Sequence, residues 1–247
     1  MKQSAVLVIR SDDKFSDLLR AAGFEVLNIE LTTTEPVKAL GEIRFKLNRL
    51  HEYDGLFFSS PAAAEVFVRH RDGSNGFHGK IYALGERAKT ILEDAGLEVS
   101  FAALANTAGE MLASFETSEF AGKRFLFVRG DKSMRTIPEF LNGRAIVDEI
   151  VVYTTEASKI DEAQITELKR RMLVGEIDWT CFFNPTGVET FAEVFGGTDF
   201  RSVRAAAIGV TTAAKALEMG LDVNFISKRS TAEEFARGLI EHINNGE

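Results

Sequence analysis

Cysteine is nearly absent from this sequence, which removes one common way of stabilising a fold. Cys181 is the single cysteine among 247 residues, so no disulfide can form within the chain. Because it stands in the apolar run 179–183, we expect a buried structural thiol rather than a nucleophile. The four histidines are scattered without the spacing of metal ligands, so we expect no metal site.

Long apolar runs and basic blocks are also missing. No segment approaches the roughly 20 apolar residues that span a bilayer. The short apolar run 5–9 is typical of a first β-strand rather than of a secretory signal. We therefore expect a cytoplasmic protein without membrane contact. The net charge is −8 and no cluster of Lys or Arg stands out, which argues against nucleic-acid binding. Neither a Gly-x-Gly-x-x-Gly motif after a strand nor a Walker loop is present, so the sequence offers no nucleotide-binding motif.

An internal repeat is the strongest pattern in the chain. One constant offset joins the following pairs: Asp54–Pro61 with Asp178–Pro185, Ala83–Gly85 with Ala207–Gly209, and Thr107–Ala108 with Thr231–Ala232. A looser similarity joins Val6–Arg10 with Phe125–Arg129. Naming the looser segments A and A′ and the closer ones B and B′, the chain reads A–B–A′–B′. A repeat of this length indicates a duplicated structural unit.

Strands and helices alternate along each repeat. The expected strands are 5–9, 24–31, 55–59, 80–84, 98–101, 124–128, 145–153, 178–183, 204–208 and 222–226. The main expected helices are 37–51, 61–70, 86–95, 108–115, 159–173, 185–194, 211–219 and 231–243. This alternation predicts an α/β fold with two parallel sheets, each covered by helices on both faces.

Several helix starts carry polar residues that suit an anionic ligand. Ser60-Pro61 and Asn184-Pro185 pair an N-cap residue with proline at the first helical position, and Thr107 and Thr231 open capping boxes. Capping alone explains these residues. However, the starts follow strand ends, where ligands of open α/β sheets bind, and free N–H groups there suit carboxylates. We therefore regard Ser59, Ser60, Asn184, Thr107 and Thr231 as candidate substrate-binding residues.

Three further residues stand at strand ends. Tyr153 ends the run 150–155, where its hydroxyl either projects toward a ligand or merely meets water at the rim of a core. Arg10 and Arg129 occupy matching positions in A and A′. A guanidinium there suits a carboxylate of a substrate or an ion pair within the protein equally well.

The combined order of motifs resembles the uroporphyrinogen-III synthase family. The segments that carry the resemblance are Phe57–Glu65, its echo Phe182–Glu189, Glu149–Thr155, Ala207–Ala213 and Ser230–Glu233. The resemblance covers nearly the whole chain. It implies a lyase of haem biosynthesis that takes hydroxymethylbilane, a linear tetrapyrrole rich in carboxylates. The enzyme would remove the terminal hydroxyl as water, form a spiro intermediate and close the macrocycle with ring D inverted.

The resemblance also assigns roles to particular residues. Tyr153 matches the family's tyrosine, which assists departure of the hydroxyl or orients the substrate. Thr212 matches a threonine of the substrate cleft, and Ser60 matches the serine of the first Ser-Pro turn. The sequence departs from the family pattern at Ala88, where many members carry threonine, and at Asn184, where serine is frequent.

The resemblance further implies two α/β domains joined by a two-stranded linker, with the cleft between them. Residues 1–33 and 158–247 would form the first domain, and residues 36–153 the second. The repeat alone equally permits consecutive pairing, as 1–120 and 121–247. We expect a monomer without a cofactor that makes transient contact with hydroxymethylbilane synthase. A protein of two lobes that binds a small anion without catalysis is the alternative.

Overall fold

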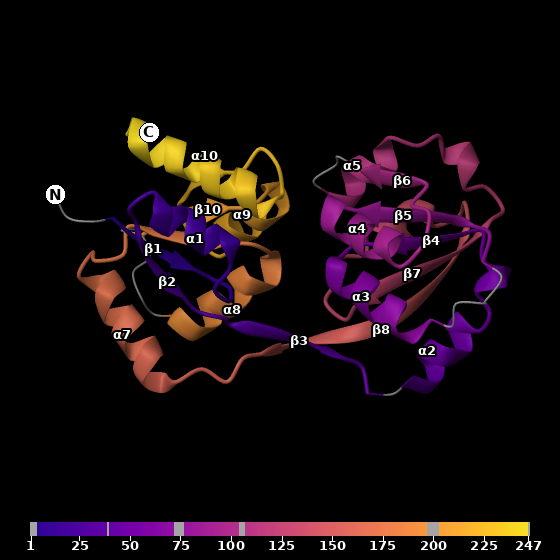
Figure 1. Cartoon of the computed structure of the whole chain (residues 1–247), viewed down its shortest axis with the longest axis horizontal. Helices are drawn as coiled ribbons and strands as arrows, with labels where there is room; N and C mark the ends of the chain where they lie inside the picture. Colours follow the sequence, from indigo (N-terminus) through magenta and orange to yellow (C-terminus); the bar gives the residue numbers. More distant parts are fainter. Residues whose placement is uncertain (1–3, 39, 72–76, 104–106, 197–202, 247) are drawn as a thin grey trace. The chain divides into compact units, whose positions relative to one another are not determined.

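The computed structural model describes residues 4–38, 40–71, 77–103, 107–196 and 203–246. The chain divides into two compact units. Unit 1 comprises Met1–Thr33 and Ala157–Glu247, and unit 2 comprises Thr34–Glu156. Each unit holds one sheet with helices on both of its faces (Figure 1). A hydrophobic core lies on either face of each sheet.

Unit 1 is built on a parallel sheet with the strand order β11-β10-β9-β1-β2. Its strands are β1 (Ala5–Val8), β2 (Glu25–Asn28), β9 (Trp179–Phe182), β10 (Arg204–Ala207) and β11 (Val223–Ile226). Its helices are α1 (Lys14–Ala21), α7 (Glu162–Leu173), α8 (Pro185–Phe195), α9 (Val210–Glu218) and α10 (Ala232–Asn245). Side chains alternate across β1, so Leu7 packs with α7, α8 and α9, whereas Val6 and Val8 pack with α1 and α10.

Unit 2 has the strand order β3-β8-β7-β4-β5-β6. Its strands are β3 (Thr32–Pro36), β4 (Gly55–Phe58), β5 (Lys80–Leu84), β6 (Phe101–Ala103), β7 (Arg124–Gly130) and β8 (Ile146–Ala157). Its helices are α2 (Leu40–Leu47), α3 (Pro61–His70), α4 (Glu86–Asp94), α5 (Ala108–Ala113) and α6 (Thr136–Leu141), with short 3-10 turns η1 (Leu50–Glu52) and η2 (Thr117–Glu119). Phe58 faces α2, α3 and α4, whereas its neighbour Phe57 faces α5 and α6.

The two sheets show how the repeat folds. Strands β4, β5 and β6 of segment B lie beside β7 and β8 of A′, while β9, β10 and β11 of B′ lie beside β1 and β2 of A. Each sheet therefore combines one A with one B segment, in the same order. This arrangement requires the chain to leave unit 1 after A and to return before B′.

The two crossings pair with each other as antiparallel strands. The amide of Ser158 donates to the carbonyl of Leu31 at 2.9 Å, and the amide of Val37 donates to the carbonyl of Val152 at 3.0 Å. Residue numbers rise along β3 as they fall along β8, which defines an antiparallel ladder. The sequence patterns ended the second strand at Tyr153, so the extension of β8 to Ala157 was missed. The strand expected at 98–101 was also misplaced, because β6 spans Phe101–Ala103.

The lone cysteine lies in the interior of unit 1. Cys181 is fully buried on β9, and burial raises the pKa of its thiol, so the expected structural role fits its environment.

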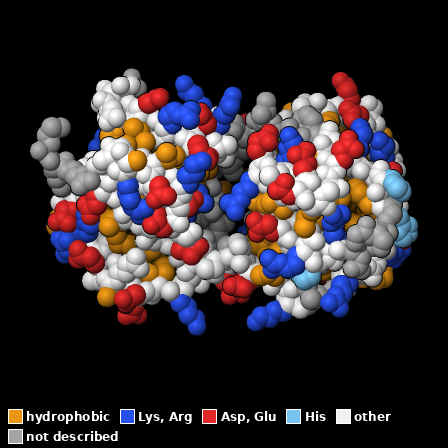
Figure 2. All heavy atoms as spheres, in the orientation of Figure 1, with side chains coloured by type: hydrophobic (Ala, Val, Ile, Leu, Met, Phe, Trp, Pro, Cys, Tyr) orange, Lys and Arg blue, Asp and Glu red, His pale blue; other side chains and the backbone are white. Residues whose placement is uncertain are grey.

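Acidic and basic side chains are interspersed over the face of each unit seen in Figure 2. No helix within the described ranges combines the length and apolar character needed to cross a bilayer. The same residues contain no group of three or more His, Cys, Asp or Glu that could hold a metal ion.

Candidate functional site

Ser59 and Ser60 stand at the carboxyl end of the unit 2 sheet, directly after β4. Ser60 has extended backbone angles and caps α3: its Oγ accepts a hydrogen bond from the amide of Ala63 at 3.2 Å. Pro61 follows at the first helical position, where no amide hydrogen is needed. The turn therefore fixes the hydroxyl of Ser60 at the positive end of α3.

Tyr153 reaches this turn from β8. Its hydroxyl oxygen lies 3.1 Å from Ser60 Oγ, within hydrogen-bond distance. The ring is partly buried against the core on the α3 face of the sheet. Two residues that are 93 positions apart in the chain are thus joined at one point of the sheet edge.

The matching turn of unit 1 is built in the same way around Asn184. Its Oδ1 accepts a hydrogen bond from the amide of Gly187 at 2.7 Å and so caps α8. Since the amide nitrogen of this side chain carries two further hydrogens, Asn184 keeps donors for a ligand. Asn184 is exposed, and the sequence of unit 1 contains no tyrosine.

Thr107 and Thr231 both act as the caps that the sequence predicts. Thr107 Oγ1 accepts from the amide of Glu110 at 3.1 Å, and Thr231 Oγ1 accepts from that of Glu234 at 3.3 Å. A hydroxyl that accepts a hydrogen bond can still donate its own hydrogen. Capping therefore leaves each threonine one donor for a substrate carboxylate.

Thr212 lies in the first turn of α9 and is buried. Its counterpart in unit 2 is Ala88, which is buried in the first turn of α4. Both helices begin at glycine, Gly209 and Gly85, and neither start has a side-chain cap among the described residues. Sequence analysis missed these two uncapped starts, although the glycine after each strand was the available signal.

Arg10 and Arg129 already have partners in their own units. The guanidinium of Arg10 lies 2.8 Å from the carboxylate of Asp13 and 4.4 Å from the centre of the Phe183 ring. Arg129 donates to Glu149 at 2.7 Å and to the backbone carbonyls of Gly130 and Asp131. A substrate carboxylate would have to share these guanidinium groups with existing contacts, so their role as substrate ligands stays a prediction.

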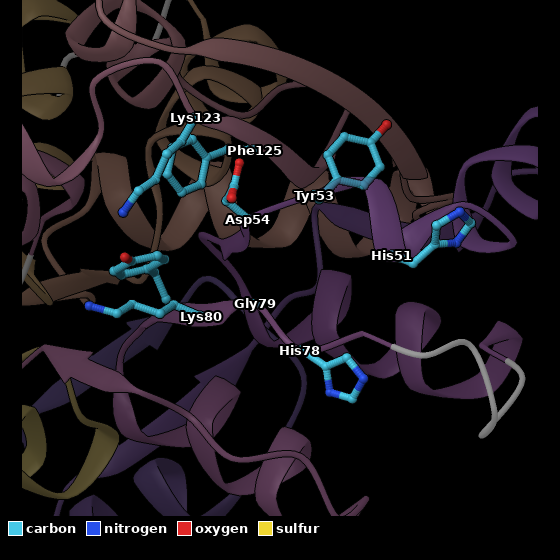
Figure 3. A pocket seen from close by; sticks show the side chains of 9 residues that line it. His51, Tyr53, Asp54, His78, Gly79, Lys80, Lys123 and Phe125 are labelled. Atoms are coloured by element: carbon cyan, nitrogen blue, oxygen red, sulfur yellow. The ribbon is translucent and has the colours of Figure 1, made fainter.

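A separate recess of about 350 Å³ opens at the opposite, amino-terminal edge of the unit 2 sheet (Figure 3). Its lining residues are His51, Tyr53, Asp54, His78, Gly79, Lys80, Tyr82, Lys123 and Phe125. Burial raises the pKa of both Tyr53 and Tyr82 to about 12, and the carboxylate of Asp148 adds to the effect at Tyr53. None of the residues predicted from sequence to bind substrate lines this recess.

Known proteins show which family shares this arrangement. Residues 13–237 match the model of the family described as uroporphyrinogen-III synthase HemD. The uroporphyrinogen-III synthase of Chlorobaculum parvum is 28% identical over 202 residues, which cover 78% of this chain and 80% of that protein.

Two solved structures have the same fold. A mutant uroporphyrinogen III synthase from Thermus thermophilus has a TM-score of 0.70 at 18% identity, covering 98% of this chain and 99% of that one. The uroporphyrinogen-III synthetase of Helicobacter pylori has a TM-score of 0.61 at 17% identity, covering 97% and 99%. The family match, which spans most of the chain, carries the assignment: the chain belongs to the uroporphyrinogen-III synthase family of haem biosynthesis.

Proposed function

We propose that the chain acts as a lyase on hydroxymethylbilane, removing water and closing the ring to uroporphyrinogen III. The C–O bond of the terminal hydroxymethyl group breaks, and its electron pair leaves on oxygen. The last pyrrole then attacks the methylene carbon left on the first ring through its own substituted α-carbon, and this new bond gives the spiro intermediate. The bond from that α-carbon to the methylene bridge of the preceding ring breaks and re-forms at the other α-carbon, which leaves ring D inverted. The proton that completes the water molecule is recovered when the closed ring loses a proton, so no further reactant is needed.

The contact between Ser60 and Tyr153 is the observation that supports a chemical role for Tyr153. Ser60 Oγ accepts from the amide of Ala63, so its own hydrogen is free to point at the oxygen of Tyr153, 3.1 Å away. The phenol hydrogen is then free to donate to the departing hydroxyl of the substrate. A chain of donors that starts at the positive end of α3 makes the phenol a stronger donor.

A neutral phenol is suited to this task. A phenol O–H donates one hydrogen bond while its oxygen accepts another. A hydrogen bond to the leaving oxygen stabilises the negative charge that grows as the C–O bond stretches, and this lowers the barrier selectively. The substrate carries several carboxylates, and we assign their binding to Ser59, Thr107, Asn184, Thr212, Thr231, Arg10 and Arg129.

Tyr153→Phe tests this role, because it removes the hydroxyl and keeps the ring. Hydroxymethylbilane generated in situ by its synthase would be offered to both proteins, and porphyrin isomers separated after oxidation. We expect kcat to fall by about tenfold or more, while KM changes little. Because the free substrate closes to the type I isomer, the share of type I would rise as the enzyme slows. Full turnover with an unchanged isomer ratio would remove Tyr153 from the chemistry.

The cellular setting and assembly belong to the same proposal. We propose that the protein works in the cytoplasm as a monomer and receives its substrate in transient contact with hydroxymethylbilane synthase. Size-exclusion chromatography with light scattering tests the monomer. Dilution of both enzymes in the presence of excess inert protein tests the contact. If the substrate passes directly between the two enzymes, the share of the type I isomer should stay low on dilution, because little substrate is released to close by itself.

A further inference from the structure

A β-bulge at the end of β8 determines where Tyr153 points. Strands β7 and β8 pair Val128 with Ile150 and Arg129 with Val151, but Gly130 then pairs with Tyr153. Val152 is therefore an extra residue on β8. It is fully buried in the core that covers the α3 face of the sheet.

The bulge turns Tyr153 to the face occupied by Ser60. Side chains of a regular strand alternate between faces, so Tyr153 should point away from the face that holds Val152. Instead, Ile150, Val152 and Tyr153 all pack against the same core, and the hydroxyl of Tyr153 lies 3.1 Å from Ser60 Oγ. An extra residue in one strand re-aims the side chains that follow it, as bulges near active sites commonly do.

Gly130 provides the space in which the ring of Tyr153 lies. A β-carbon added to Gly130 would lie 2.3 Å from Cζ and 2.6 Å from the hydroxyl oxygen of Tyr153. These distances are far below a van der Waals contact. Any residue other than glycine at position 130 must therefore displace the phenol from its place beside Ser60.

The turn after β7 holds the backbone on both sides of this ring. The amide of Asp131 donates to the carbonyl of Tyr153 at 3.1 Å, and the amide of Thr155 donates to Asp131 Oδ1 at 2.9 Å. Ser133 closes the turn, because its Oγ accepts from the amide of Gly130 at 3.1 Å. These contacts keep the ring and the glycine in register.

We infer that Gly130 is a positioning residue for the reaction: its missing side chain, together with the bulge at Val152, places the hydroxyl of Tyr153 against Ser60 and toward the substrate. The inference rests on the proposed role of Tyr153. It predicts that a side chain added at position 130 lowers activity only because it displaces the ring of Tyr153.

A double-mutant comparison tests that dependence. Gly130→Ala should lower kcat by about tenfold to a hundredfold, since a displacement of about 1 Å can cost that much. In a Tyr153→Ala background the ring is gone and the new methyl group has room, so Gly130→Ala should change kcat less than about twofold. Gly41→Ala is the matched control, because Gly41 is exposed on α2 with nothing within 4 Å of an added β-carbon. It should leave activity unchanged.

Carbon NMR of ring-labelled tyrosine separates the geometry from the chemistry. The chain has three tyrosines, and Tyr153→Phe identifies the signal of Tyr153. Gly130→Ala should shift that signal, and Gly41→Ala should not. A shifted signal with normal turnover and isomer ratio would overturn the catalytic part of the inference and the proposed role of Tyr153, while the steric contact stands.

Two other results bear on the inference itself. An unshifted signal with unchanged activity would overturn it, and so would an equal loss of activity from Gly130→Ala in the presence and absence of the ring. If Gly130→Ala does not fold, the double variant Gly130→Ala/Tyr153→Ala decides: a folded double variant supports the inference, because removing the ring has removed the clash. An unfolded double variant, beside folded Tyr153→Ala, overturns it.

Discussion

Replacing Ser60 by alanine should destabilise unit 2 more than the equivalent replacement of Asn184 destabilises unit 1. Both residues cap a helix that begins with proline, at matching positions of the repeat. Loss of an N-cap costs about 0.5–2 kcal/mol in either unit. Ser60 also contacts the hydroxyl of Tyr153 at 3.1 Å, and a hydrogen bond of that kind adds about 0.5–1.5 kcal/mol. We therefore expect Ser60→Ala to cost about 1–3.5 kcal/mol in total.

The two units can be followed separately by urea unfolding. Trp179 is the only tryptophan and is fully buried in unit 1, so its fluorescence reports unit 1, whereas far-ultraviolet circular dichroism reports both units. Asn184→Ala should move the fluorescence transition, which reports unit 1, to lower urea concentration. Ser60→Ala should leave the fluorescence transition in place and move to lower urea concentration only the part of the dichroism change that belongs to unit 2. The coupling between Ser60→Ala and Tyr153→Phe should be about 0.5–1.5 kcal/mol. Additive effects of these two substitutions would refute the hydrogen bond.

Three further predictions follow from burial and position. Cys181→Ser should lower the stability of unit 1 by about 1–3 kcal/mol, because it buries a hydroxyl in an apolar site, and the native thiol should resist alkylation until the protein unfolds. The folded protein holds the pKa of Tyr82 at about 12, above its unfolded value of about 10, so its contribution to stability is complete below pH 10 and is lost as the pH rises toward 12. The melting temperature of Tyr82→Phe should accordingly fall less steeply between pH 10 and pH 12 than that of the unchanged protein. An identical slope would contradict the raised pKa of Tyr82. If Thr212 binds substrate, Thr212→Ala should raise KM severalfold and leave the circular dichroism spectrum unchanged. A KM equal to that of the unchanged protein would mean that Thr212 does not bind a substrate carboxylate.

Local patterns were sufficient to predict most of the α/β fold. Capping residues before proline mark α3 and α8, and short β-branched or aromatic runs mark the central strands, because both signals act within a few residues. The constant offset between B and B′ indicates the duplication. The same offset leaves the pairing of segments open, because it does not show which A segment lies beside which B segment. In the sheets, the strands of A lie beside those of B′, and the strands of A′ lie beside those of B.

The geometry around Tyr153 was beyond reach of local patterns. Both Tyr153 and Ser60 stood out as strand-end residues, but their contact depends on a bulge that inserts one residue into β8. A bulge has no residue signature here, because Val152 is as apolar as its neighbours. Gly130 was equally hidden, since its importance comes from a ring 23 positions further along the chain that packs over it.

The strand-end arginines show a different limit. Arg10 and Arg129 match in the repeat and were candidates for binding carboxylates, yet each contacts a carboxylate of its own unit, Asp13 and Glu149. A sequence identifies a charged side chain but does not show whether a neighbour already neutralises it. Such pairing is decided by tertiary contacts, as between β7 and β8 for Arg129.

The isomer ratio of the product shows whether this protein inverts ring D as it closes the macrocycle. Hydroxymethylbilane would be generated by its synthase in the presence and absence of this protein, and the oxidised porphyrins separated by liquid chromatography. Our account predicts that the type III isomer replaces type I when the protein is added. Formation of type I alone, with folded protein in excess over the synthase, would contradict the assignment of a ring-inverting synthase.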